Sequence, residues 1–109
     1  MRALFVTAVL VVGLAPAFPA DAADPALGEK IYLKRCASCH AADGGGNAKM
    51  AGILKVTIPD LRATTKSDAE LRTIIAGGKP PMPGFGKQLS SDELQAVVAY
   101  SKSLTKTGR

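Results

Sequence analysis

Apolar residues recur at helical spacing in three parts of the chain, and each part begins with a pattern typical of a helix N-terminus. The first has Asp24 as N-cap and Pro25 at the first helical position, and it runs towards Cys36. In the other two, a serine is followed three residues later by a glutamate, which is a capping box. The apolar stripes consist of Leu27, Ile31, Leu71, Ile74, Ile75, Leu94, Val97 and Val98. Because no convincing strand pattern accompanies them, the sequence predicts a small all-α fold of three to four helices.

The boundaries of the later helices follow from their end signals. The second predicted helix begins at Ser67 and ends at the glycine pair 77–78, and the third begins at Ser90 and continues almost to the C-terminus. Gly28 lies inside the first helix, where glycine costs about 1 kcal/mol relative to alanine. This glycine indicates a close approach by another helix, and a merely tolerated glycine is the alternative.

The segment between the first two predicted helices carries few periodic signals. Residues 41–66 include a glycine-rich run and are expected to be mostly irregular. A short helical turn is expected over residues 49–54. Residues 53–58 fit helix and strand about equally, so their conformation stays open.

Residues 1–22 have the pattern of a secretory signal peptide. A positive charge at Arg2 precedes an apolar run of about 13 residues, which is shorter than the roughly 20 that a membrane-spanning helix needs. Residues 20–22, Ala-Asp-Ala, form a small-x-small cleavage site. We therefore expect cleavage near Ala22, a mature domain over residues 23–109, and no stable membrane insertion after cleavage. An uncleaved anchor is the alternative.

Composition limits what the mature domain can be. Removal of the leader from the 109-residue chain leaves 87 residues, near the lower limit for a domain stabilised by an apolar core alone. Only three aromatic residues belong to this part, so something else must fill its centre. The formal net charge is +5, but the chain has no basic run or nucleic-acid motif. We therefore expect no nucleic-acid partner.

The chain contains one motif with specific chemistry, Cys36-Ala37-Ser38-Cys39-His40. It holds both cysteines and the single histidine of the protein. C-x-x-C-H is the attachment sequence for a c-type haem. On a turn of helix, residues three apart lie on one face, so both thiols can meet one porphyrin edge while the imidazole reaches the iron. The sequence predicts one haem c, bound through Cys36 and Cys39, with His40 as an iron ligand.

Three other interpretations of the motif are less well supported. Zinc normally takes four protein ligands, or three and water, and the chain has no second cysteine–histidine pair. A thioredoxin-like redox pair would need a βαβ context, which is missing from the pattern. A structural disulfide between the two cysteines would close a very small loop and stabilise the fold little.

The second axial ligand is expected to be Met82. The mature chain offers two methionines, Met50 and Met82, and lysines that would have to lose a proton first. Met82 lies between prolines in residues 79–86, a segment too rich in proline for an ordinary helix or central strand. Such a stiff loop could hold a thioether against the iron, and thioether is a soft ligand that raises the haem potential. Ligation by Met50, and a Met82 that only packs against the ring, are the alternatives.

With these motifs, residues 24–105 resemble the class I c-type cytochromes, the small soluble bacterial kind that includes cytochrome c6-like and c555-like proteins. The resemblance rests on the Cys36–His40 motif, on the Pro80-Pro81-Met82-Pro83 run and on a closing helix with Tyr100. It implies that the N- and C-terminal helices cross. It also implies that the haem is attached outside the cytoplasm.

The same resemblance assigns contacts to particular residues. Near the helix crossing it implies that Gly28 and Tyr32 meet a group of residues on the last helix, namely Leu94, Val97 and Tyr100. It further implies that the carbonyl of Pro59 accepts a hydrogen bond from the second ring nitrogen of His40. Such a bond would fix the tautomer and strengthen the imidazole as a donor to iron.

We expect a soluble one-electron carrier and not an enzyme, because both axial positions would be filled. The alternatives are a haem enzyme or gas sensor with a labile methionine ligand, and an electron-entry module of a larger oxidase or dehydrogenase. The leader places the protein in the periplasm. We expect a monomer that meets redox protein partners, with an acidic docking surface on the partner if the basic residues Lys34, Arg35, Lys79 and Lys87 ring the haem edge.

Overall fold

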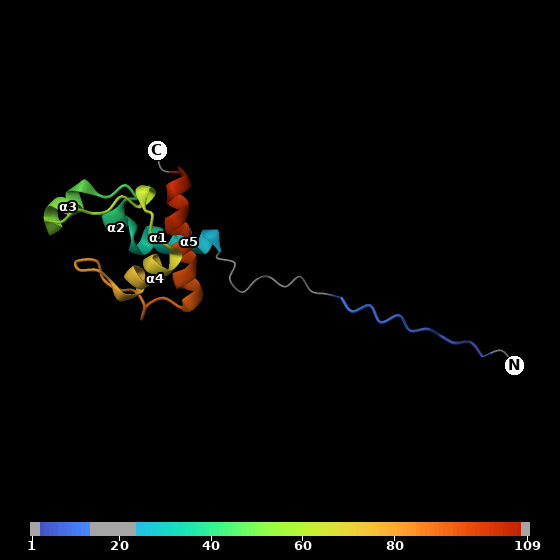
Figure 1. The fold of residues 1–109 in the computed structure, drawn as a ribbon. Helices are drawn as coiled ribbons and strands as arrows, with labels where there is room; N and C mark the ends of the chain where they lie inside the picture. Colours follow the sequence, from blue (N-terminus) through green and yellow to red (C-terminus); the bar gives the residue numbers. More distant parts are fainter. Residues whose placement is uncertain (1–2, 14–23, 108–109) are drawn as a thin grey trace.

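The protein is described by a computed structural model that covers residues 3–13 and 24–107. Over these residues it forms five α-helices, one 3₁₀ turn and no strand (Figure 1). The prediction of an all-α fold is confirmed. In chain order the elements are α1 (Pro25–Arg35), α2 (Ala37–His40), α3 (Ala48–Leu54), η1 (Leu61–Ala63), α4 (Asp68–Gly77) and α5 (Ser91–Thr107).

The three long helices begin where the local hydrogen-bonding signals place them. At α1, Asp24 Oδ1 accepts from the backbone N–H groups of Ala26 at 3.0 Å and Leu27 at 3.3 Å. Capping boxes precede the other two helices. The Ser67 hydroxyl accepts from the backbone N–H of Glu70 before α4, and the Ser90 hydroxyl accepts from the backbone N–H of Glu93 before α5. These side chains satisfy backbone donors that a helix N-terminus leaves free.

Helices α1 and α5 cross and pack closely (Figure 1). A methyl group on Gly28 would overlap the carbonyl oxygen of Ala96 and lie 2.9 Å from Cβ of Tyr100. The aromatic rings of Tyr32 and Tyr100 lie 5.2 Å apart at an angle of 52°. Gly28 is therefore required by a close approach of backbones, and Ala96 is a partner that the sequence did not indicate.

The core lies between α1, α4 and α5. Tyr32 and Val97 are fully buried at its centre. The remaining members of the cluster come from the predicted apolar stripes, with two additions, Phe85 from the proline-rich segment and Leu104 near the end of α5. The buried cluster consists of Ile31, Tyr32, Leu71, Ile75, Phe85, Leu94, Val97, Val98 and Leu104.

The segment 41–66 is less irregular than expected. The short turn predicted over residues 49–54 is α3, and η1 follows further along the chain. The undecided residues 53–58 are the end of α3 followed by irregular backbone, with Lys55 in the left-handed region at φ 54°. The first helix ends at Arg35 with Cys36 as its C-cap, and α2 follows as a separate four-residue helix.

Residues 3–13 form no helix or strand, and their large apolar side chains are exposed. Residues 14–23, with the expected cleavage site after Ala22, lie outside the described residues. Within residues 3–13 and 24–107, no helix is both long enough and apolar enough to span a membrane.

Candidate haem site

The structure brings the cysteine–histidine motif and the proline-rich segment to one cavity of about 620 Å³. Its volume falls within the range of about 300–1,000 Å³ that is usual for ligand sites. Cys36, Cys39, His40, Pro59 and Met82 all line it. Most of the other lining side chains are apolar and come from residues 54–61, from α4 and from residues 79–85, among them Leu54, Val56, Ile58, Leu61, Leu71, Ile74, Ile75, Pro80, Pro81, Pro83 and Phe85.

The carbonyl groups of the motif are held by the loop that follows it. The backbone N–H groups of Gly46 and Asn47 donate to the carbonyls of His40 and Cys39, both at 2.8 Å. The side-chain amide of Asn47 donates to the carbonyl of Ser38 at 3.2 Å. Helix α2 has only four residues and could not hold itself by intrahelical bonds. The loop 43–47 therefore fixes the turn that carries both thiols and the imidazole.

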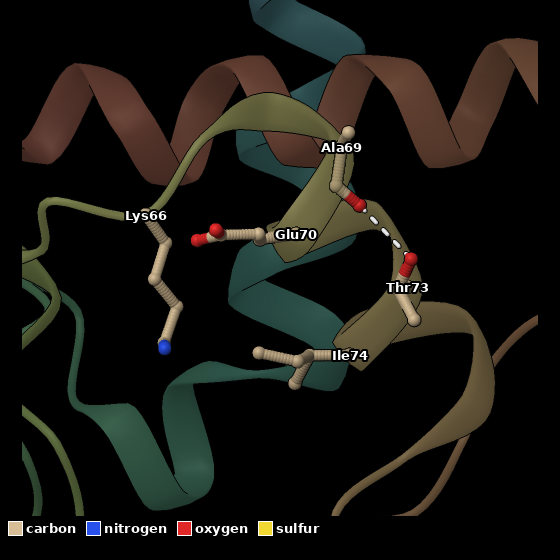
Figure 2. Close-up of a pocket in the computed structure, with 5 residues that line it drawn as sticks. All are labelled: Lys66, Ala69, Glu70, Thr73 and Ile74. Carbon is tan, nitrogen blue, oxygen red and sulfur yellow. Dashed lines mark hydrogen bonds between the residues drawn. The ribbon is translucent and has the colours of Figure 1, made fainter.

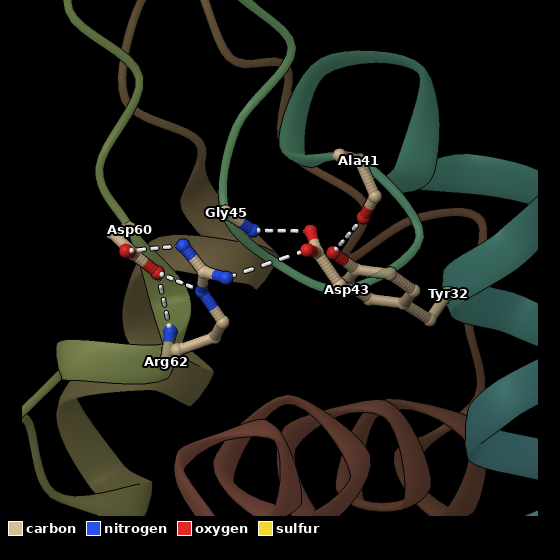
Figure 3. Close-up of polar contacts among 6 residues, drawn as sticks. All are labelled: Tyr32, Ala41, Asp43, Gly45, Asp60 and Arg62. Atoms are coloured by element: carbon tan, nitrogen blue, oxygen red, sulfur yellow. Dashed lines mark hydrogen bonds and ion pairs between the residues drawn. The ribbon is translucent and has the colours of Figure 1, made fainter. Parts of the chain in front are cut away.

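Tyr32 adds a bond from the core. Its hydroxyl donates to the carbonyl of Ala41, directly after the motif, at 2.6 Å (Figure 3). Burial is the largest cause that raises the pKa of Tyr32 above its usual range, so the phenol stays protonated and remains a donor. Ala41 itself has φ 65° and ψ 162°, a region that glycine adopts readily and alanine does not.

The two thiols are free, partly buried and not paired with each other. Burial, with a smaller contribution from Cys39, raises the pKa of the Cys36 thiol to about 11. A thiol of this kind is mostly protonated at neutral pH and is a poor thiolate nucleophile. Within the described residues there is also no group of three or more His, Cys, Asp or Glu side chains that could hold a metal ion by themselves.

His40 has a buried ring nitrogen without a partner. Its Nδ1 atom makes no hydrogen bond of acceptable distance and angle. The pKa of His40 is lowered, mainly by burial, while an interaction with the backbone of Pro59 raises it in part. Pro59 therefore lies near enough to act as an acceptor, but the geometry falls short of a formed hydrogen bond. A histidine that binds metal through one nitrogen usually donates from the other, and this arrangement fits that role.

Met82 is held by backbone contacts. The N–H and carbonyl groups of Lys79 and Met82 bond to each other, at 2.8 and 3.0 Å, around a cis Pro80–Pro81 peptide bond. The segment then returns to the end of α4, where the Phe85 N–H donates to the Ile75 carbonyl at 2.8 Å. Met82 is half-buried and packs against the core cluster.

Gly84 shows how closely this segment lies on α4. A methyl group here would be 2.6 Å from the carbonyl oxygen of Ala76 and 2.7 Å from the carbonyl carbon of Gly77. Only a residue without Cβ allows such a contact between two backbones. Met50, the alternative ligand, lies on α3 and does not line the cavity.

The charged residues that line the cavity are only in part those that the sequence suggested for the haem edge. Arg35 and Lys79 line it, whereas Lys34 and Lys87 do not. Lys66 lines it as well, and no motif marked that residue.

A second hollow of about 380 Å³ is open to solvent on the side of α4 (Figure 2). It is formed by Lys66, Glu70, Ile74 and two small side chains, and Thr73 donates to the Ala69 carbonyl at 3.0 Å. The hollow gathers no set of polar groups that converge on one point, and we assign no site to it.

The comparisons with known proteins identify the class that the fold and site define. The family described as cytochrome C oxidase, cbb3-type, subunit III matches residues 23–100. Cytochrome c6 of a Synechococcus strain is 40% identical over 86 residues, which are 78% of this chain and 71% of the relative. Cytochrome c6 of a Picosynechococcus strain is 36% identical over 109 residues, 92% of each chain. The solved KustC0563 c-type cytochrome superposes with a TM-score of 0.62 at 26% identity, covering 71% of this chain and 95% of that one.

The chain therefore belongs to this family and is a small class I c-type cytochrome. Membership implies covalently bound haem c, and the residues present fit that group. Two thiols and an imidazole stand on one turn, the cavity that they line is largely apolar, and the second imidazole nitrogen is buried without a partner.

Proposed function

We propose that the protein is a soluble one-electron carrier whose single haem c is attached through Cys36 and Cys39 and ligated by His40 and Met82. The observation that carries this proposal is that all four side chains line one cavity although they come from two segments far apart in the sequence. When bound, haem c supplies an iron centre that takes up and releases one electron.

The protein supplies a fixed and largely apolar surrounding for that centre. The attachment turn is held through its own carbonyls, and the Met82 segment is held against the end of α4, so neither ligand-bearing segment depends on the other for its conformation. A thioether in such a segment favours the reduced state of iron and raises the potential.

The cavity offers few groups that could donate or accept a proton in catalysis, which favours an electron carrier over an enzyme. His40 is the single histidine of the chain and would be bound to iron. Asp60 lines the cavity, but hydrogen bonds from Arg62 hold the pKa of its carboxyl below the usual range. An ionised, hydrogen-bonded carboxylate is not available as a general acid near neutral pH.

We infer that the partners are redox proteins with an acidic docking surface. Arg35, Lys66 and Lys79 line the cavity and are exposed, whereas Asp60 is the only acidic lining residue in the described part of the chain. Electron transfer to an acidic partner should slow steeply as ionic strength rises. Transfer that does not depend on salt would count against this surface.

We also propose that residues 1–22 direct export and are removed, so that a monomer works in the periplasm. Mass spectrometry of protein purified from the periplasm would place the new N-terminus near Ala23. A retained leader would instead favour an anchored electron-entry module of a larger oxidase or dehydrogenase.

Met82→Ala tests the ligand set, with Met50→Ala as the matched control. The first variant should lose the long-wavelength band of a methionine–iron bond and bind carbon monoxide readily when reduced. The control should keep the spectrum, because Met50 does not line the cavity. If wild-type protein bound carbon monoxide at neutral pH, a gas-sensing or catalytic cytochrome with a labile Met82 bond would replace the carrier.

A further inference from the structure

Arg62 joins two loops that are far apart in the sequence. Its guanidinium is bidentate on Asp60, with Nε to Oδ1 and Nη2 to Oδ2 both at 2.9 Å. Its Nη1 reaches Asp43 Oδ2 at 3.4 Å, while Asp43 Oδ1 accepts from the backbone N–H of Gly45 at 2.8 Å (Figure 3). One side chain thus bridges the loop after the attachment turn and the loop before η1.

The two bridged loops carry the two partners of one contact at the haem site. Asp43 lies three residues after His40, and Asp60 directly follows Pro59. A backbone bond runs parallel to the side-chain bridge, because the Leu61 N–H donates to the Gly44 carbonyl at 2.8 Å. The separation between these loops therefore controls how near the Pro59 carbonyl comes to the imidazole.

That contact is sensitive to small displacements. Nδ1 of His40 is buried and has no formed hydrogen bond, while the backbone of Pro59 lies close enough to act on the ring. A shift of a few tenths of an ångström would bring this pair into hydrogen-bond geometry or take it further away, since hydrogen bonds weaken steeply with distance and angle.

We propose that Arg62 is a positioning residue, which holds the Pro59 carbonyl against Nδ1 of His40 and thereby sets the reduction potential of the haem. The proposal rests on the proposed function, because it takes His40 as an iron ligand. Arg62 does not itself line the cavity, and among the lining residues it bonds to Asp60, so it acts through Asp60 and Asp43.

The direction of the change in reduction potential distinguishes a positioning role of Arg62 from a purely electrostatic effect of its charge. A stronger bond from Nδ1 makes the imidazole a better donor, which stabilises oxidised iron and lowers the potential. Loss of the bridge should therefore raise the potential. Loss of a positive charge would do the opposite, because a nearby cation disfavours the oxidised, more positive state.

Arg62→Lys keeps the charge and removes the bidentate geometry, so it isolates positioning. We expect a more positive midpoint potential by spectroelectrochemistry, an unchanged Met82–iron band, and faster exchange of the His40 Nδ1 proton by NMR. Arg72→Lys is the matched control: Arg72 donates to the Ser91 hydroxyl at 2.8 Å, between α4 and α5. The control should leave both the potential and the proton exchange unchanged.

Asp43→Glu provides a second, charge-preserving variant should the first fold poorly. It displaces the carboxylate from Arg62 and from the Gly45 N–H, and should also raise the potential. In the double variant the two shifts should not add, because both remove one bridge. An unchanged or lowered potential in Arg62→Lys and Asp43→Glu, with His40 and Met82 still bound, would overturn the positioning role. Wild-type protein without His40–iron ligation would instead overturn the proposed function.

Discussion

The two segments that bring candidate ligands to the cavity are held in different ways. In the attachment turn, residues 36–47, the Tyr32 hydroxyl from α1 and the side-chain amide of Asn47 from the turn's own loop donate to backbone carbonyls. The methionine loop, residues 78–86, is fixed by backbone bonds and by a glycine that lies on α4. The attachment turn can therefore be loosened one hydrogen bond at a time, whereas the methionine loop fails when a backbone contact is blocked.

The largest effect is expected in the methionine loop, from Gly84→Ala. The new methyl group would lie 2.6 Å from the Ala76 carbonyl oxygen, and both partners are backbone atoms that cannot rotate away. We expect a loss of about 3 kcal/mol in the free energy of unfolding, together with loss of Met82 ligation. Denaturant unfolding of the holoprotein and its visible spectrum measure the two.

Gly77→Ala is the control for that variant. No heavy atom lies within 4 Å of the position its methyl group would take. As a helix residue at the end of α4 it should leave stability unchanged or raise it by up to about 1 kcal/mol. Equal stability of the Gly84 and Gly77 variants would mean that the methionine loop does not rest on α4 as described.

A smaller effect is expected in the attachment turn, from Tyr32→Phe. The substitution keeps the ring in the core but leaves the Ala41 carbonyl without its 2.6 Å donor. We expect a loss of about 1–2 kcal/mol in the free energy of unfolding. Tyr100→Phe is the control, since its hydroxyl forms no hydrogen bond within the described residues and the ring pair is preserved. A similar loss in both variants would assign the effect to ring packing and not to the turn.

Ala41→Gly should strengthen the same turn. Ala41 at φ 65° and ψ 162° occupies a region that costs a residue with Cβ between about 1 and 3 kcal/mol. Glycine removes that strain but gains freedom in the unfolded chain, so we expect a net stabilisation of about 1 kcal/mol in denaturant unfolding. The Met82–iron band should not change, because the methionine loop is held independently. A destabilised variant would show that the strain at Ala41 is not stored in the native state.

Sequence alone predicted the structural features that depend on residues close together in the chain. The capping boxes at Ser67 and Ser90 place the starts of α4 and α5 because each is a hydrogen-bonding unit only four residues long. The role of Gly28 was also predictable, since an interior glycine weakens a helix unless a close contact requires it. The break at Cys36 was not, because residues 33–40 contain no glycine or proline that would mark the end of a helix.

The polar contacts of the site depend on residues that no local pattern connects. Arg62 and Asp43 are 19 residues apart in the chain, and their bridge exists only because two irregular loops fold beside each other. Lys66 reaches the cavity for the same reason. The motifs predicted that the thiols, the imidazole and the thioether meet at one site, whereas the polar contacts around them depend on the path of loops 41–47 and 55–66.

Low pH should destabilise the attachment turn more than the methionine loop. This effect should be smaller than those of the Gly84, Tyr32 and Ala41 substitutions. Hydrogen bonds from Arg62 lower the pKa of Asp60, and those from Ser90 lower the pKa of Glu93. A carboxylate with a lowered native pKa stabilises the fold above its unfolded pKa of about 4, and this contribution is lost as the pH falls through the native pKa. The methionine loop contains no carboxylate.

The free energy of unfolding should therefore fall below about pH 4 in the wild type and less so in Asp60→Asn, which has already lost the ionised partner of Arg62. Glu93→Gln is the comparison, since it removes another hydrogen-bonded carboxylate, at the start of α5. Both variants should flatten the pH profile of unfolding, but only Asp60→Asn should also speed the exchange of the His40 Nδ1 proton at neutral pH. If both variants sped it, the two carboxylates would act on the fold as a whole, and the distinction between the two segments would not extend to charge.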